Sequence, residues 1–203
     1  LGSVNLAAHI TSDGKINTKK LKTTIFTAMR MLDNVIEYNY YSVDKAKNSN
    51  LKHRPVGLGI MGFQDALYKI RVPYESEEAV DFADKSMEYV SYFAIEASME
   101  LSKERGAYES FNGSLWSQGV MPIDSLKKLK KIRGKYLDVN LDESLKWDEL
   151  REKIKANGMR NSNTLAIAPT ATISNICGVS QSIEPTYQNL YVKSNLSGEF
   201  TVI

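Results

Sequence analysis

The chain has 203 residues, of which 42% are hydrophobic and 25% charged; these values are typical of a soluble globular protein with one sizeable core or two small ones. Its formal net charge of +2 is too small to indicate nucleic-acid or membrane binding, and no apolar run approaches the ~20 residues of a transmembrane helix. One cysteine excludes an internal disulfide and two histidines argue against a zinc site, so we expect a cytoplasmic protein without a metal of its own.

The first third of the chain predicts alternating strands and helices. Residues 1–10 are typical of a short strand or an extended entry, and a long helix is predicted over 18–44. Its apolar positions recur at steps of three or four: Leu21, Ile25, Met29, Leu32 and Ile36. The polar segment 45–55 is expected to break this helix before a glycine-containing strand at 56–62 and a helix at 63–70.

The rest of the chain predicts more helix, then strands. Ser76 is a plausible N-cap for a helix over 76–105, which should end at Arg105-Gly106. One face of that helix is apolar: Ala79, Phe82, Val90, Phe93, Ala97 and Leu101. A shorter amphipathic helix is predicted over 147–158, followed by an apolar run of strand length and a tail of β-type composition around a turn at Asn195–Gly198. The pattern indicates an α/β fold rich in helix.

Two segments invite a binding interpretation that the composition does not support. The basic cluster SLKKLKKIRGK (125–135) is short, and we interpret it as a solvated face, not as a nucleic-acid site. Gly57, Gly59 and Gly62 have the G-x-G-x-x-G spacing of a dinucleotide-binding turn. The residues before Gly57 are polar and broken by a proline, so we favour a strand where backbones pack closely.

The segment APTATISN (168–175) is the best candidate for chemistry. Pro169 ends the apolar run, and Thr170, Thr172 and Ser174 then place three hydroxyls within five residues. A strand that leads into a helix exposes N–H groups and the positive end of the helix dipole, which together form an anion site. From the residues alone, capping and local Ser/Thr turns explain the hydroxyls equally well.

Four long segments resemble one family. They are LGSVNLAAHI (1–10), RPVGLGIMGFQDALYKIRVPY (54–74), ADKSMEYVSYFAIEASMELSKERGAYESF (83–111) and GMRNSNTLAIAPTATISNICGVSQSIEPTYQNLYVKSNLSGEF (158–200). Taken in this order, they closely resemble the large (α) subunit of class I ribonucleotide reductases. The resemblance implies that residues 1–203 are a single, incomplete segment of a ten-stranded catalytic α/β barrel, from the C-terminal half of a longer subunit. It also implies that the glycine segment is a barrel strand.

The same resemblance implies an activity. The family reduces ribonucleoside diphosphates to 2′-deoxyribonucleoside diphosphates for DNA synthesis, by a cysteine thiyl radical. The implied partners are the diphosphate substrate, a metal-containing β subunit that supplies the radical, thioredoxin or glutaredoxin as reductant, and a second copy of the full-length subunit. The implied effectors, ATP and deoxynucleoside triphosphates, bind elsewhere in the full protein, and this chain holds no cofactor.

Site residues follow from the resemblance position by position. The loop that binds the substrate diphosphate matches the segment Pro169, Thr170, Ala171, Thr172, Ile173 and Ser174. No catalytic residue is assigned in this chain, because Cys177 matches no catalytic cysteine and is expected to be a buried structural residue. Tyr40 and Tyr41 do not match the tyrosine pair of the family's radical pathway, and we expect them to pack on the first long helix.

Two alternatives stay open at this point. The chain resembles, less specifically, the barrel of adenosylcobalamin-dependent class II reductases. It could also act as a non-catalytic phosphate-binding module, since a single thiol does not suffice for the chemistry.

Overall fold

Three parallel strand segments form the centre of the fold. The computed structural model describes residues 1–137, 139–196 and 198–202. In it β1 (Gly2–Asn5) pairs in parallel with β2 (Leu58–Met61), with Gly2 opposite Leu58. A third segment, residues 163–166, lies on the other edge of β2, held by backbone hydrogen bonds and by a parallel bridge between Leu58 and Leu165. The predicted strands at the start of the chain and at the glycine segment are thus found as β1 and β2, whereas the apolar run after the 147–158 helix forms only a single bridge, at Leu165.

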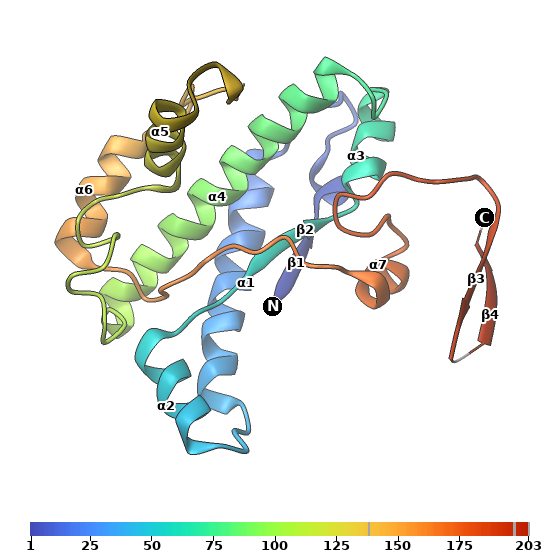
Figure 1. The fold of residues 1–203 in the computed structure, drawn as a ribbon. Coiled ribbons are helices and arrows are strands. Elements are labelled where there is room, and N and C mark those ends of the chain that lie inside the picture. The colour runs from blue at the N-terminus through green and yellow to red at the C-terminus, as the bar shows by residue number, and fades with distance from the viewer. Residues whose placement is uncertain (138, 197, 203) are drawn as a thin grey trace.

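Helices connect these strands. The crossover from β1 to β2 contains the 3-10 helix η1 (Leu6–His9), α1 (Thr18–Tyr38) and α2 (Asp44–His53). The crossover from β2 to the third segment contains α3 (Phe63–Ile70), α4 (Glu77–Arg105), α5 (Pro122–Arg133), η2 (Gly134–Tyr136) and α6 (Trp147–Asn157). Parallel strands need such crossovers, and Figure 1 shows the helices beside the short sheet. The short helix α7 (Ala171–Cys177) follows the third segment.

The helix predicted over 18–44 is shorter than expected. α1 ends at Tyr38, where Asn39 is extended and the Tyr41 hydroxyl donates a hydrogen bond to the carbonyl of Ile36, at 2.9 Å. That hydroxyl pairs one of the carbonyls that a helix end leaves free. The expected break at 45–55 is wrong over most of its length, because α2 forms there with no buried residue. Its charges suit the helix dipole, with Asp44 in the first turn and Lys52 and His53 in the last.

The long helix α4 follows the prediction closely. Ser76 caps it by accepting a hydrogen bond from the N–H of Ala79 at 3.1 Å, and Gly106 ends it. Phe93 and Leu101 are buried as expected. Of the two long helices, α1 packs against a strand, whereas α4 packs chiefly against α1 and α6. This helix is therefore an outer layer that covers α1.

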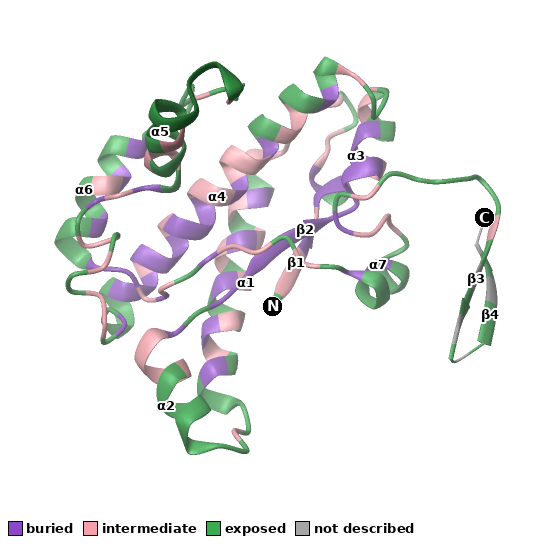
Figure 2. Cartoon of the chain, in the orientation of Figure 1, coloured by how far each residue is buried: buried purple, intermediate pink, exposed green. Residues whose placement is uncertain are grey.

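Two apolar clusters hold these layers together, and Figure 2 shows buried residues along β2 and on parts of α1 and α4, whereas β1 is mostly of intermediate exposure. The larger cluster joins the strands to α1, α3 and α4. The smaller one lies under α6: Ile95, Met99, Tyr108, Met121, Trp147, Leu150, Ile154 and Met159. Because α4 contributes residues to both clusters, it links the sheet side of the molecule to α6.

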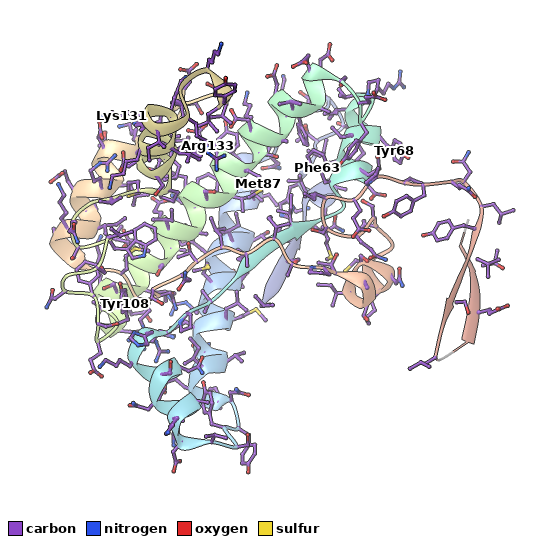
Figure 3. The ribbon with its side chains drawn as sticks, in the orientation of Figure 1. Phe63, Tyr68, Met87, Tyr108, Lys131 and Arg133 are labelled. Carbon is purple, nitrogen blue, oxygen red and sulfur yellow. The ribbon has the colours of Figure 1, made fainter. Side chains whose placement is uncertain are left out.

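The basic residues of α5 and the C-terminal hairpin are not part of these clusters. The basic residues of α5, including Lys131 and Arg133, are exposed, as the solvated-face interpretation predicts (Figure 3). The predicted tail strands are an antiparallel hairpin of β3 (Tyr191–Asn195) and β4 (Gly198–Val202), which projects from the rest of the chain (Figure 1). No helix among the described residues is both long and apolar enough to cross a membrane.

Truncating Phe93 tests this packing. Phe93→Ala should lower the free energy of unfolding by about 3–5 kcal/mol, because the ring is buried where α4 meets α1 and a cavity would remain. Urea denaturation of the full-length protein measures the change. Phe93→Leu retains most of the apolar volume and should cost clearly less. Equal stability of wild type and Phe93→Ala would contradict the burial of this helix face.

Candidate functional site

Two glycines allow the third strand segment to lie directly against β2. A Cβ atom added to Gly57 would be 2.6 Å from Leu1 Cδ2 and 2.8 Å from Ala166 Cβ. One added to Gly59 would meet the backbone carbonyl oxygen of Ala166 at less than 3.0 Å, a separation that real Cβ atoms essentially never show. The spacing of these glycines is therefore explained by close backbone packing, as we favoured from the sequence.

The third glycine positions the chain that follows α7. Gly62 has φ of +72° at the start of α3, in the left-handed region that favours glycine, and a Cβ there would be 3.1 Å from Val179 Cβ. Its N–H donates to the carbonyl of Ser180 at 2.9 Å, and the N–H of Ser180 donates to the Asp65 carboxylate at 2.7 Å. The loop after α7 is thus fixed to the first turn of α3.

The six residues of the predicted phosphate loop form a turn and the first turn of α7. Thr170 is the N-cap residue, and the N–H of Ser174 makes the first helical hydrogen bond, to the Thr170 carbonyl at 2.9 Å. Within the part of the chain that the structure describes, the N–H groups of Ala171, Thr172 and Ile173 have no hydrogen-bond acceptor. Pro169 and these three residues are exposed. The arrangement is the one that makes a helix N-terminus attractive to an anion.

The three hydroxyls of this loop are not equivalent. Thr170 is buried, and its Oγ1 accepts a hydrogen bond from the N–H of Ser182 at 2.8 Å. Ser174 is also buried, and its Oγ has no hydrogen-bond partner among the described residues. Thr172 alone is exposed. Thr170 therefore secures the loop through a residue 12 positions away and not by side-chain capping or a local turn, and Thr172 is the hydroxyl that faces solvent.

A buried charge network lies at the other end of the third segment. The Asp33 carboxylate, on α1, is fully buried and contacts three guanidinium groups: Arg54 at 2.9 Å, Arg105 at 3.0 Å and Arg160 at 3.2 Å. Burial by itself would raise the pKa of the Asp33 carboxyl, but Arg160 and Arg54 outweigh it, so its pKa lies below the ordinary value. Glu37, at the solvent side, adds a second carboxylate to Arg54.

Asn161 connects this network to the strand. Its side-chain amide donates to Asp33 Oδ1 at 3.2 Å and to the carbonyl of Arg54 at 3.0 Å. Its Oδ1 accepts from the hydroxyl of Ser98 at 2.9 Å, and its own N–H donates to the same hydroxyl oxygen at 3.0 Å. Asn161 is fully buried, so every polar atom of its side chain is paired away from water.

The sequence analysis missed this network, although one signal was present. Asp33 falls four residues after Met29 and three before Ile36, on the same buried face of α1. A charged residue in register with an apolar stripe indicates a buried charge, and such a charge needs a partner. The identity of its partners could not be read in the same way, because Arg54, Arg105 and Arg160 lie far apart in the chain.

Two expectations about individual side chains are wrong. Cys177, expected to be buried, is exposed at the last position of α7, because that helix buries only Ser174. Tyr40, expected to pack on the long helix, is 87% exposed because α1 ends two residues before it. Tyr41 does contact α1, through the hydroxyl bond to Ile36. The described residues contain no group of three or more His, Cys, Asp or Glu side chains placed to hold a metal ion.

Comparison with known proteins identifies the family. The family described as "Ribonucleotide reductase, barrel domain" matches residues 1–203. The chain belongs to this family. Its parallel strands and covering helices are therefore a helix-rich part of the reductase α/β barrel, as the sequence predicted.

Three relatives illustrate the similarity. The ribonucleoside-diphosphate reductase subunit alpha of Chlamydia muridarum (strain MoPn / Nigg) is 56% identical over 204 residues, covering 100% of this chain and 19% of that protein. The subunit alpha of Helicobacter pylori (strain ATCC 700392 / 26695) is 41% identical over 205 residues, covering 100% and 25%. The large chain of Schizosaccharomyces pombe (strain 972 / ATCC 24843) is 39% identical over 203 residues, covering 100% and 24%. This part of the reductase barrel thus spans about a fifth to a quarter of the relatives' length.

The close approach of Gly59 to the backbone of Ala166 can be tested by adding a methyl group at position 59. Gly59→Ala in the full-length protein should lower its free energy of unfolding by about 1–3 kcal/mol, because the new methyl group meets backbone and the chain at Ala166 must move. Gly2→Ala, in the partner strand, is the matched control, since its Cβ would make an ordinary 3.5 Å contact with Leu32. Thermal unfolding compares the two variants. Similar stability of both would show that the strand segments are not held this closely.

Proposed function

We propose that the polypeptide containing this chain is the large subunit of a ribonucleoside-diphosphate reductase, and that residues 169–174 bind the diphosphate of its substrate. The family membership and the names of the relatives support the activity. The relatives are named as alpha or large subunits, which supports a separate β subunit as the radical source and favours this class over the cobalamin-dependent one. Thioredoxin or glutaredoxin as reductant and a homodimer of the full-length subunit belong to the same proposal.

The observation that carries the site is the set of donors at the start of α7. The N–H groups of Ala171, Thr172 and Ile173 lie together in the first turn, and the Thr172 hydroxyl is exposed beside them. Phosphate oxygens are acceptors only, so donors and the positive end of the helix dipole suit them. Ser174 offers a further hydroxyl, whose lack of a partner in this buried place would otherwise cost about 1–3 kcal/mol.

The chain's own residues position the substrate in this proposal and do not carry out the radical chemistry. Replacing the 2′-hydroxyl by hydrogen releases water and takes two electrons, which a pair of thiols supplies as it becomes a disulfide. A third thiol, oxidised to the thiyl radical, removes and later returns the 3′-hydrogen. Cys177 is the only thiol among residues 1–203, and it is exposed at the far end of α7 from the proposed phosphate site.

Removing the exposed hydroxyl tests the site. In the full-length enzyme, Thr172→Val should raise KM for the nucleoside diphosphate about tenfold or more, since a hydrogen bond to a charged group contributes about 1.5–3 kcal/mol. Because the lost bond reaches the diphosphate and not the reacting carbons, kcat should change less. Thr27→Val is the matched control, as Thr27 is also an exposed helical threonine. A substrate-bound structure with the diphosphate more than one residue shell away from 169–174 would refute the location.

A second test asks whether residues 1–203 can carry out the reduction by themselves. Residues 1–203 expressed alone should form no deoxynucleotide above background with any nucleoside diphosphate, reductant or β subunit, because a single cysteine cannot act as both radical and dithiol. Product analysis by chromatography measures this, with the full-length enzyme as the positive control. Product formed by the purified segment would overturn the assignment of the chemistry to residues outside this chain.

A further inference from the structure

The third strand segment has a sequence that does not fix its own register. Residues 165–168 are Leu-Ala-Ile-Ala, apolar on both faces of a strand. Strand register is strongly specified where one face is apolar and buried, because a one-residue slip moves the apolar side chains to the other face. In a segment that is apolar on both faces, such a slip replaces apolar side chains by apolar ones. The ladder to β2 is also short: Val56 N–H donates to Asn163, Leu58 N–H to Thr164, and Ala166 N–H to Leu58, at 2.9–3.2 Å. A slip along this ladder would move the turn at Pro169 and the start of α7.

Polar contacts at both ends of the segment hold it in one register on β2. At its C-terminal end, Thr170 is held by Ser182, whose N–H donates to its hydroxyl oxygen. At its N-terminal end, Asn161 is held by Asp33, Ser98 and the carbonyl of Arg54. The residue that follows Arg54 by two, Val56, begins the ladder. Asn161 therefore fastens the segment to the same stretch of chain with which it pairs.

A shift of Asn161 would be costly. Its side chain bonds to groups of residues that are themselves buried, since Asp33 and Ser98 are both fully inaccessible and Arg54, whose carbonyl accepts the third bond, is 4% exposed. Moving the segment by one residue would take Asn161 away from the Ser98 hydroxyl and the Arg54 carbonyl, which would then lose this partner away from water. Buried ionic networks are weak evidence for stability, and their best-attested use is to specify one arrangement among several.

We propose that Asn161, held by the Asp33 network, is a positioning residue that fixes the register of residues 163–166 on β2 and so places the loop 169–174. The proposal deepens, and rests on, the diphosphate role proposed for that loop. Asn161 contacts no substrate in this scheme. It acts through the strand, by determining which residue reaches the turn at Pro169.

Asn161→Ala in the full-length enzyme, assembled with its radical-generating partner, tests the proposal. It removes the amide contacts but leaves the carboxylate of Asp33 with its three arginines. We expect KM for the nucleoside diphosphate to rise about tenfold, as a displaced binding group would cause, with a smaller change in kcat. Amide hydrogen exchange of residues 163–174, measured without nucleotide, should become about tenfold faster.

Ser102→Ala is the matched control. Ser102 is also buried, and its hydroxyl donates to the carbonyl of Asn157 at 2.7 Å, so its loss loosens α4 and α6 without touching the segment. It should change stability but neither KM nor the exchange of residues 163–174. If Asn161→Ala does not fold, Ser98→Ala is the second variant, because it removes the hydroxyl that bonds to both the side chain and the N–H of Asn161. It should also raise KM and speed the exchange of residues 163–174, by smaller factors than Asn161→Ala.

The outcomes separate the two proposals. Equal KM and equal exchange in the Asn161→Ala and Ser102→Ala variants would overturn the positioning role. If Thr172→Val raises KM, so that the loop does bind the diphosphate, faster exchange in Asn161→Ala with an unchanged KM would also overturn the positioning role. If Thr172→Val leaves KM unchanged and the diphosphate is found elsewhere, the proposed site fails, whereas the exchange measurement still decides whether Asn161 fixes the register.

Discussion

The contact on which this part of the barrel depends is the one between the backbone of Gly59 and the carbonyl of Ala166. It is possible only because position 59 has no side chain, and the same is true of Gly57 against Ala166 Cβ. With the third segment seated on β2, Pro169 falls at the end of the strand and α7 begins where its free N–H groups are exposed. A motif with dinucleotide-binding spacing thus serves a different purpose, which is to bring two backbones together.

The buried network at Asp33 adds a second constraint of a different kind. Apolar contacts between α1, α4 and the strands are not directional, so they hold the layers together without choosing one register. Three arginines around one buried carboxylate are directional, because each guanidinium must point its N–H groups at an oxygen. These arginines come from the residue after α2, the end of α4 and the chain after α6, so one carboxylate orders three connections at once.

The features that were predicted correctly from the sequence depend on interactions between residues close together in the chain. The Ser76 cap, the glycine after Arg105 and the apolar stripe of α4 each act within a few residues, and all were found as predicted. α2 was missed because its helix has no buried face and therefore no apolar period. The predicted burial of Cys177 was wrong because burial depends on which elements pack against that side of α7, and not on the residue type. The pairing of Asp33 with Arg160, 127 residues away, is set by the topology and could not be read from spacing.

The proposed phosphate loop combines a fixed frame with free donors, and this division has a physical reason. Thr170 and the chain at Ser180–Ser182 are tied to each other and to the start of α3, so the loop does not need to become ordered when an anion arrives. Ordering a flexible segment on binding reduces affinity, and a loop held in advance avoids that loss. The Thr170 hydroxyl holds the loop in place and is therefore not the one expected to bind the phosphate. Since Thr170 fixes the turn, Thr172 and the neighbouring amides are left for the ligand, which a count of hydroxyls alone could not distinguish.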